Sequence, residues 1–377
     1  MKVFHISPSF YPAGHYGGPI YSGYSLCNGL ARLPGVELRV LTTDSDGPRR
    51  VDIQAETKPV LNYGVHYCRR WIRPDFAAGF FLRLPAMIRW ADVVHLTAVY
   101  SSPTLPTLLL CRLLSKPVVW STRGALQRWN ESTKLQLKSV WETFCNSLCS
   151  SKRVVLHVTS EDEGRESAAK IPNAGVAVIP NGIHLPNLNG YHRQANGELR
   201  LLYLGRLHPI KGIENLLHAI KKSSCDVKLS ICGDGELGYV AGLQSLANQL
   251  ELKPQVQFFG HVDGAIKETQ FAESDLCVVP SFKENFCMVV AESLAHGVPV
   301  IASRGTPWQK LESIGCGLWV DNNPESLADA IKRIRLMPLN EMGERGRTWM
   351  ANEFSWESVS NQMLSLYREL AQSNHAN

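Results

Sequence analysis

Two basic side chains in the second half of the chain have the spacing and chemistry to bind a diphosphate. Arg206 and Lys211 lie in the segment 204–212, which follows a strand-like apolar run. Fixed cations at the carboxyl end of a strand can stabilise a departing diphosphate when no metal supplies the charge. Gly233, after the next strand, would let a nucleotide approach the backbone, although a single Gly-x-Gly is also common in ordinary turns.

Two carboxylates frame the next candidate, a helix predicted over 286–296. Glu284 precedes it, and Glu292 lies eight residues on, about 12 Å further at roughly 1.5 Å per residue. Free N–H groups at a helix start suit a phosphate, and two carboxylate oxygens suit the vicinal hydroxyls of a ribose. The alternative is that both glutamates are ordinary exposed helix residues. The N–H groups in question belong to Cys287, Met288 and Val289.

A third candidate is the glycine-rich loop 12–19 near the amino terminus. It contains Gly14, Gly17 and Gly18 between the first strand-like run and the first helical segment. Glycine permits positive φ and close backbone contact with a ligand, so Gly17 and Gly18 are candidate donor-binding residues. A plain tight turn explains the same composition equally well.

Short apolar runs alternate with helix-length segments along the whole chain, and these elements must position the candidates. Ten runs are predicted as strands, and among the segments between them 213–222, 237–250 and 286–296 read as helices. Strand and helix in alternation predict an α/β fold with two doubly wound, Rossmann-like parallel sheets. The predicted strands are 2–7, 36–42, 92–96, 117–121, 154–159, 199–205, 227–232, 256–260, 276–280 and 299–303.

Turn chemistry divides the chain into two predicted domains. The polar segment 181–198 interrupts the apolar periodicity and is interpreted as a hinge and linker. It separates an amino-terminal domain, 1–180, from a carboxyl-terminal domain, 199–355. Because open α/β sheets bind ligands at the carboxyl ends of their strands, we expect the two domains to face a cleft that holds the main site.

Taken together, these motifs resemble those of the retaining glycosyltransferases of family 4, which have the GT-B fold. The resemblance rests on the E-x7-E pair Glu284/Glu292, the G-R-x4-K-G motif with Arg206 and Lys211, the hinge at 181–183 and the amino-terminal glycine loop. It covers nearly the whole chain, with the motifs in the order of the family.

The resemblance implies a role for each residue. Glu284 would lie near the donor sugar, Glu292 would bind the ribose, and Arg206 and Lys211 would hold the diphosphate without a metal. The carboxyl-terminal domain would bind a nucleotide sugar, and the amino-terminal domain would take the acceptor. The last helix of the family packs back on the first domain, which implies the same for 356–377.

Two positions depart from the family pattern. Many members carry a histidine after the fourth strand, near the reacting sugar, where this chain has Arg123. Arg123 is therefore the candidate for that catalytic position. A glycine-rich loop commonly follows the strand after the E-x7-E helix, and the segment 304–308 stands in its place here.

The resulting prediction is a transferase that moves a hexose or similar sugar to a hydroxyl acceptor. The resemblance implies front-face attack, and we expect a lipid-linked saccharide as acceptor in cell-surface polysaccharide biosynthesis. Two alternatives stay open: a sugar-nucleotide 2-epimerase of the same fold, and a two-domain solute-binding protein. The second would normally carry an export signal, and the sequence shows none.

The basic charge is concentrated in the first half of the chain. Residues 1–180 contain 21 Lys and Arg against 13 Asp and Glu, whereas 181–377 contain 18 against 21. The segment 69–90 interleaves five arginines with aromatic residues, a composition suited to an anionic membrane surface. Packing of the aromatic residues against the sheet is the alternative. We expect a cytoplasmic protein, peripheral on the membrane, with no nucleic-acid partner.

The cysteines and histidines predict no metal site and no cofactor. The ten cysteines include no CxxC pair, which is typical of reduced thiols in the cytosol. His5 and His157 lie in strand-like runs and are interpreted as core histidines. His95, near the carboxyl end of its run, has two interpretations: a core histidine like the other two, or a residue that lines the cleft.

Overall fold

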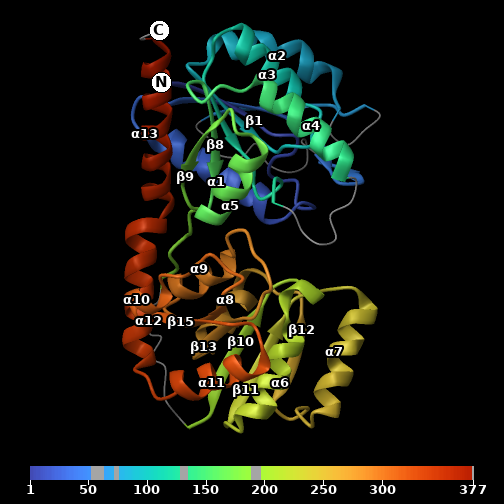
Figure 1. Cartoon of the computed structure of the whole chain (residues 1–377), viewed down its shortest axis with the longest axis vertical. Coiled ribbons are helices and arrows are strands. Elements are labelled where there is room, and N and C mark those ends of the chain that lie inside the picture. Colours follow the sequence, from blue (N-terminus) through green and yellow to red (C-terminus); the bar gives the residue numbers. More distant parts are fainter. Residues whose placement is uncertain (52–62, 72–75, 128–134, 188–196, 376–377) are drawn as a thin grey trace. The chain divides into compact units, whose positions relative to one another are not determined.

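The computed structural model describes residues 1–51, 63–71, 76–127, 135–187 and 197–375. The chain divides into two compact units (Figure 1). Unit 1 comprises Met1–Gly182 together with Trp356–Asn377, and unit 2 comprises Ile183–Ser355. The chain therefore leaves unit 1, builds unit 2 and returns to unit 1 for its last helix. Of the predicted linker 181–198, residues 188–196 lie outside the described residues.

Unit 1 is built on a seven-stranded parallel sheet with strand order β5-β2-β1-β6-β7-β8-β9. The order runs outward from β1 in both directions, which is the doubly wound arrangement. Its strands are β1 (Lys2–Ile6), β2 (Glu37–Thr43), β5 (Gly64–Cys68), β6 (Val93–Thr97), β7 (Val118–Ser121), β8 (Val154–Val158) and β9 (Gly175–Val178).

Helices cover both faces of this sheet, and alternate residues of each strand point to opposite faces. Phe4 of β1 packs with α2, α3 and α4, whereas Val3 packs with α1 and α13. Both faces of the central strands β1, β6, β7 and β8 are buried, so these strands are mostly apolar, as is usual for parallel sheets. The helices are α1 (Gly18–Arg32), α2 (Ala78–Trp90), α3 (Thr104–Leu113), α4 (Leu135–Leu148), α5 (Glu161–Lys170) and α13 (Trp356–His375).

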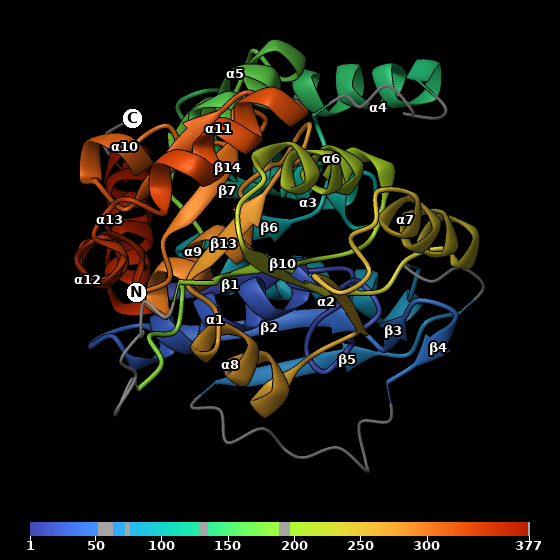
Figure 2. The same ribbon diagram turned by 90° about the horizontal axis from the view of Figure 1, so that it is seen from below.

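A small hairpin follows the carboxyl end of β2 in unit 1. Strands β3 (Ser45–Asp46) and β4 (Arg49–Arg50) pair antiparallel, and Figure 2 shows them beside β5. Asp44 holds the hairpin, because its Oδ1 accepts a hydrogen bond from the Arg70 N–H at 2.7 Å. The Arg70 guanidinium in turn donates to the Gly47 and Pro48 carbonyls at 2.6 and 2.7 Å.

Unit 2 contains a six-stranded parallel sheet with order β12-β11-β10-β13-β14-β15. This order again reverses direction at the first strand of the unit, between β10 and β13. Ligands in such sheets bind at that switch point, outside the carboxyl ends of the strands. The strands are β10 (Leu199–Leu204), β11 (Val227–Cys232), β12 (Val256–Gly260), β13 (Leu276–Val279), β14 (Val300–Ser303) and β15 (Gly317–Val320).

The helices of unit 2 also lie on both faces of its sheet, in two separate apolar clusters. One cluster contains α6 (Ile213–Ser223), α7 (Leu237–Gln249) and α11 (Pro324–Ile334), and the other contains α8 (Gly264–Ala272), α9 (Met288–Ala295) and α10 (Leu311–Ile314). α12 (Leu339–Trp349) contributes to both. Two short helices complete the unit, η1 (Pro209–Lys211) and the π-helical η2 (Met350–Phe354).

The structure confirms the predicted α/β class with two Rossmann-like sheets and revises some boundaries. The helix predicted over 286–296 is shorter, because α9 runs only from Met288 to Ala295. Glu284 therefore lies in the preceding loop and not on the helix axis, so the expected 12 Å axial spacing does not apply. The edge strands β5, β9 and β15 were not predicted. In β5 and β9 more and less exposed residues alternate, which dilutes the apolar run.

Candidate functional site

Glycines at the switch point of unit 2 bring three loops into backbone contact. A Cβ at Gly233 (φ +148°) would stand 1.8 Å from the Gly205 carbonyl oxygen. At Gly212 (φ +62°) it would stand 2.3 Å from the Pro280 carbonyl oxygen. No other residue type fits either position without moving backbone. The glycines of the 204–212 and 233–235 segments thus pack the loops together, a role the sequence analysis did not assign to Gly233.

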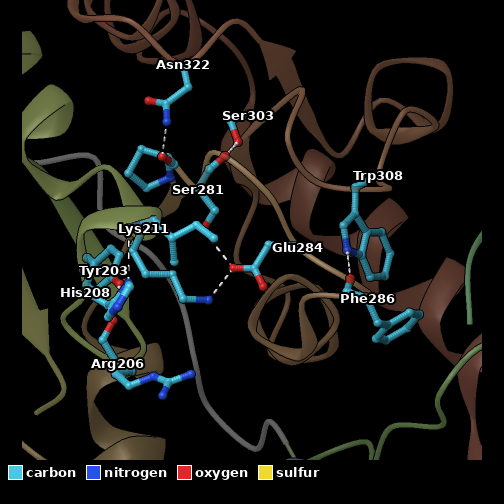
Figure 3. A network of polar contacts seen from close by, with 12 residues as sticks. Tyr203, Arg206, His208, Lys211, Ser281, Glu284, Phe286, Ser303, Trp308 and Asn322 are labelled. Atoms are coloured by element: carbon cyan, nitrogen blue, oxygen red, sulfur yellow. Dashed lines mark hydrogen bonds and ion pairs between the residues drawn. The ribbon is translucent and has the colours of Figure 1, made fainter. Parts of the chain in front are cut away.

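The centre of the candidate site is a Lys211–Glu284 ion pair (Figure 3). Lys211 Nζ lies 2.5 Å from Glu284 Oε1, and the same oxygen accepts a hydrogen bond from Ser281 Oγ at 2.7 Å. The two side chains are 20% and 14% exposed, so the pair is largely shielded from solvent and still reachable by a ligand. The structure therefore brings together two predicted site residues that are 73 positions apart in the sequence.

Arg206 extends from the same loop as Lys211, as Figure 3 shows. Its side chain is exposed, and none of the ion pairs found among the described residues includes it. The Tyr203 hydroxyl donates to the Arg206 carbonyl at 3.0 Å, which fixes the backbone below the guanidinium. The loop therefore presents one held cation and one free cation beside the end of β10.

The segment 304–308 supports the Glu284 loop. The Glu284 N–H donates to the Gly305 carbonyl at 2.8 Å, and Trp308 Nε1 donates to the Phe286 carbonyl at 2.6 Å (Figure 3). A Cβ at Gly305 would stand 2.3 Å from the Phe282 carbonyl oxygen, so glycine is needed there too. The departure from the family pattern at this segment thus has a structural role, which is to position the carboxylate.

The start of α9 has no side-chain cap from the described residues. Cys287 precedes the helix with φ 66° and ψ 73°. The first N–H groups of a helix lack intrahelical acceptors, so those of Met288 and Val289 can meet an oxyanion. Burial raises the pKa of the Cys287 thiol well above its ordinary value, and Glu284 raises it further, so this thiol is not a thiolate nucleophile.

Glu292 has a partner that the sequence did not reveal. Lys267 Nζ, from α8, lies 2.6 Å from Glu292 Oε1, and both side chains are about one quarter exposed. A ligand that binds Glu292 must therefore share the carboxylate with Lys267 or displace it. Glu284 pairs with Lys211 and Glu292 pairs with Lys267, so the two members of the E-x7-E pair belong to separate polar groups among the described residues.

Arg123 lies in unit 1, in a strained turn after β7. Its φ is 51° and that of Gly124 is 75°, and its Nη1 donates to Asn181 Oδ1 at 2.6 Å. Burial lowers the pKa of Arg123, and the nearby Glu163 carboxylate opposes this effect. Arg123 Nε is buried and has no hydrogen-bond partner within the described residues.

Glu163 holds the Arg123 turn, a role that the sequence gave no sign of. Its side chain is fully buried and accepts four hydrogen bonds, from the Gly124 N–H and the Thr122 hydroxyl on Oε1 and from the Thr159 N–H and hydroxyl on Oε2. These bonds span 2.5 to 2.8 Å. A carboxylate with four donors is a rigid clamp between β7, β8 and α5.

A buried row of histidines crosses the same sheet on its α1 and α13 face. His95 Nε2 lies 2.7 Å from Ser121 Oγ, and Ser121 Oγ lies 2.6 Å from His157 Nδ1. His5 pairs with His95 in register, and the Tyr367 hydroxyl of α13 contacts His95 Nδ1. His5 and His157 are core residues as predicted, and His95 is also fully buried, which fits the core alternative for this residue and not the cleft-lining one.

Burial keeps these three histidines neutral. Desolvation, followed by the positive charge of Arg123, lowers the pKa of His5 and of His157 to about 3. The pKa of His95 is lowered well below its ordinary value by burial and by its histidine neighbours. The row is therefore a neutral hydrogen-bonded layer at neutral pH.

Gly17 and Gly18 lie at the start of α1. Gly17 has φ 62° and Pro19 occupies the first turn, which explains the glycine as a helix entry. A Cβ would meet nothing within 4 Å at either position, so the space beside both backbones is open. That space is compatible with the predicted ligand contact.

The aromatic residues of the segment 69–90 mostly pack into unit 1. Phe80 is buried in the core, and Phe76, Phe81 and Trp90 are half-buried. The Arg39 guanidinium lies 4.0 Å from the centroid of the Trp90 ring. Of the five aromatic residues only Trp71 is exposed, so the packing alternative describes this segment better. Arg73 and Pro74 lie outside the described residues.

Among the described residues no group of three or more His, Cys, Asp or Glu side chains is placed to hold a metal ion. Within the same residues, no helix combines the length and the apolar character needed to cross a bilayer. All ten cysteines are buried and free of disulfides.

Two family models match consecutive parts of the chain. Residues 16–186 match the model described as Glycosyltransferase Family 4, and residues 190–349 match Glycosyl transferases group 1. An uncharacterized glycosyltransferase of Methanocaldococcus jannaschii is 30% identical over 181 residues, 45% of each chain. D-inositol 3-phosphate glycosyltransferase of Mycobacterium leprae is 28% identical over 229 residues, 56% of this chain and 53% of that protein. The chain spans about half the length of the curated relatives it matches.

Solved structures show the same fold over almost the whole chain. Sucrose-phosphate synthase from Thermosynechococcus elongatus aligns with a TM-score of 0.72 at 22% identity, covering 99% of this chain and 100% of that one. Anabaena HepE in complex with UDP aligns with a TM-score of 0.71 at 17% identity, covering 97% and 99%. With a family 4 model over its first half, a group 1 model over its second and this shared fold, the chain belongs to the GT-B glycosyltransferases.

Proposed function

We propose that this protein transfers a hexose or similar sugar from a nucleotide sugar to a hydroxyl acceptor with retention of the anomeric configuration. The observation that carries the proposal is the Lys211–Glu284 pair with the free Arg206 beside it at the switch point of unit 2. Two cations and an anchoring carboxylate at the carboxyl end of a parallel strand suit a diphosphate.

The donor chemistry has support from fold neighbours. HepE has been solved in complex with UDP and with UDP-glucose, and it shares this fold. In our proposal the diphosphate lies between Arg206, Lys211 and the N–H groups at the start of α9. Glu292 binds the ribose hydroxyls, and Lys267 moves aside or bridges to the same sugar.

The proposed reaction is a front-face displacement. The bond between the anomeric carbon and the diphosphate oxygen breaks, and the acceptor oxygen bonds to the same face of that carbon. The acceptor proton passes to the leaving diphosphate, whose growing charge Arg206 and Lys211 stabilise. No metal or cofactor takes part in this scheme. Arg123, clamped by Glu163, is the proposed catalytic residue of unit 1.

The proposed acceptor is a lipid-linked saccharide used in cell-surface polysaccharide synthesis, at the cytoplasmic face of the membrane. Two fold neighbours support a saccharide acceptor, namely WaaG, described as involved in lipopolysaccharide biosynthesis, and the lipopolysaccharide outer core galactosyltransferase WaaB. They align with TM-scores of 0.62 and 0.69.

A donor panel tests the proposal directly. We expect the purified protein to use one of the UDP-, GDP-, ADP- or dTDP-sugars as donor. It should transfer the sugar of that donor to an acceptor, or hydrolyse the donor slowly when no acceptor is present. The rates should be the same with and without EDTA. Mass spectrometry and NMR of the products distinguish the possibilities. Epimerised donor would identify a 2-epimerase, and binding without turnover would identify a solute-binding protein. Turnover restored only by Mg²⁺ or Mn²⁺ would contradict the metal-free scheme.

The two glutamates should affect different kinetic constants. Glu292→Gln should raise the donor KM more than it lowers kcat, because ribose contacts are about equally strong in the ground and transition states. Glu284→Gln should lower kcat, because it releases Lys211 from its position. Steady-state kinetics of both variants at saturating acceptor measure the split. The opposite pattern would mean that the two roles are exchanged.

A further inference from the structure

A pocket lies at the amino-terminal edge of the unit 1 sheet, away from the Arg123 turn. Val118 and Val154, the first residues of β7 and β8, line it, whereas Arg123 follows the other end of β7. Its volume is about 390 Å³. Neither the family models nor the site in unit 2 assigns a role to this pocket.

Among the described residues, the pocket is lined by four cations and by no carboxylate. Arg112 is the next-to-last residue of α3, Lys116 follows this helix, and Lys152 and Arg153 precede β8. Arg112 donates to the Ser147 carbonyl, Lys116 Nζ donates to the Ala91 carbonyl at 2.6 Å, and Arg153 Nη1 donates to Ser115 Oγ at 3.1 Å. All three acceptors are neutral. None of the four basic side chains takes part in an ion pair with another described residue, so their positive charges are not neutralised. Such a pocket attracts a phosphate.

Exposed apolar side chains flank the pocket. Leu113, next to Arg112, is 69% exposed, and Phe144, one turn before the pocket residue Leu148, is 60% exposed. The hydrogen bond from Arg112 to Ser147 holds the carboxyl ends of α3 and α4 together, so both side chains lie at the pocket end of the two helices. Leu109 and Val140, one turn earlier on each helix, continue the exposed apolar surface. We call Leu109, Leu113, Val140 and Phe144 the apolar ridge.

On the two helices that carry the apolar ridge, α3 and α4, the exposed charges are all basic. The only acidic residue within α3 and α4 is Glu142, which is buried and accepts a hydrogen bond from Tyr100. Basic residues beside apolar ones, without exposed acids, are complementary to an anionic lipid surface, where phosphates lie above acyl chains. A free phosphate would use the cations and leave the apolar ridge in water.

We propose that this end of unit 1 docks on anionic lipid, with a headgroup phosphate in the four-cation pocket and the apolar ridge at the boundary of the acyl chains. The surface differs from the segment 69–90, most of whose aromatic residues are packed. The inference goes beyond the proposed function, because within unit 1 it concerns the end of the sheet opposite to the Arg123 turn, and because it holds for any donor or acceptor.

Vesicle sedimentation tests the proposal with the full chain. We expect binding to phosphatidylcholine vesicles that contain phosphatidylglycerol, weak binding to phosphatidylcholine alone, and release as salt rises. The variant with Arg112→Gln, Lys116→Gln, Lys152→Gln and Arg153→Gln should lose roughly 600-fold in partitioning, because each of the four basic residues contributes about fivefold. Lys152→Glu, at an exposed side chain, gives a second reading that does not depend on how the fourfold variant folds.

Two comparisons decide the source of the phosphate and the location of the surface. Leu113→Ser with Phe144→Ser should lower vesicle binding about tenfold and leave calorimetric binding of inorganic phosphate unchanged. The matched control, Arg69→Gln with Arg83→Gln and Arg89→Gln, should bind vesicles as the parent does. Loss in this control but not in the fourfold variant, or equal binding to neutral and anionic vesicles, would overturn the proposal. So would phosphate binding without any vesicle binding.

The fourfold variant should keep its transfer activity toward a soluble acceptor. A failure of vesicle binding with activity intact therefore rejects the docking surface alone. A missing activity in the parent protein rejects the proposed function and leaves the vesicle result to be judged by itself.

Discussion

Lys211→Ala should lower kcat by 100-fold or more, and Arg206→Ala should have a similar effect. Negative charge develops on the leaving diphosphate in the transition state, and removing one preorganised donor from such a site costs roughly 3 to 4 kcal/mol. Lys211 is held in place by Glu284 at 2.5 Å before any ligand arrives, so its contribution needs no reorganisation. Initial rates with the active nucleotide sugar measure the effect.

The chain offers a matched control for the charge. Lys222→Ala removes a cation of α6 whose partner, Glu325, lies on the exposed side of unit 2, and it should leave kcat unchanged. The double variant Lys211→Ala with Glu284→Gln should lose little more than Lys211→Ala alone, because the two residues act as one unit. If the losses in kcat of the two single variants added up in the double variant, the two residues would not act as one unit. That result, or a Lys211→Ala enzyme with full activity, would contradict a catalytic role for the ion pair.

The second large effect concerns stability at acid pH. The folded-state pKa of His5 and of His157 is lowered to about 3 by burial, whereas a histidine in the unfolded chain titrates near 6.5. The unfolded state therefore binds more protons below pH 6.5, and stability that is fully present above that pH is lost as pH falls towards 3. At pH 5 each of the two costs roughly 2 kcal/mol relative to pH 7, and His95 acts in the same direction.

Denaturant unfolding between pH 7 and pH 5, followed by a probe in unit 1, measures this loss. The slope of unfolding free energy against pH measures the number of protons taken up on unfolding. His5→Leu should lower that number by close to one. His5 is buried, and its Nδ1 has no hydrogen-bond partner within the described residues. His261→Gln, at an exposed histidine of unit 2, is the control and should leave the slope unchanged. An unchanged slope in His5→Leu would assign the acid sensitivity to other groups.

The fold could be predicted from local sequence pattern. The central strands of the two sheets are short apolar runs, and such a run can be recognised as a buried strand without knowing which residues it contacts. β1, predicted at 2–7, is observed at Lys2–Ile6, and α6, predicted at 213–222, is observed at Ile213–Ser223. The helix predicted over 286–296 was too long at both ends, since Cys287 adopts a left-handed backbone that periodicity does not report.

The sequence motifs selected the residues of the candidate site, but they did not show which other side chains these residues contact. Lys211 and Glu284 were both selected from motifs, yet their direct ion pair follows only from how the loops after β10 and β13 meet. Lys267 on Glu292 and Glu163 under Arg123 lie 25 and about 40 positions from their partners. Such contacts depend on the packing of α8 and α5, which no spacing rule encodes.

The return of α13 to unit 1 has a consequence for protein synthesis. Tyr367 and Met363 of this helix are buried against the β1 and β6 face, and a Cβ at Gly29 of α1 would overlap Ser360. A ribosome that adds roughly 5 to 20 residues each second completes the strands of unit 1 at least several seconds before α13 emerges. During that interval the apolar surface around Leu26 and Leu30 has no cover. Unit 2 is one continuous stretch of the chain, so it can complete its fold before unit 1 does. During synthesis, chaperones and proteases therefore meet mainly the uncovered part of unit 1 near the amino terminus.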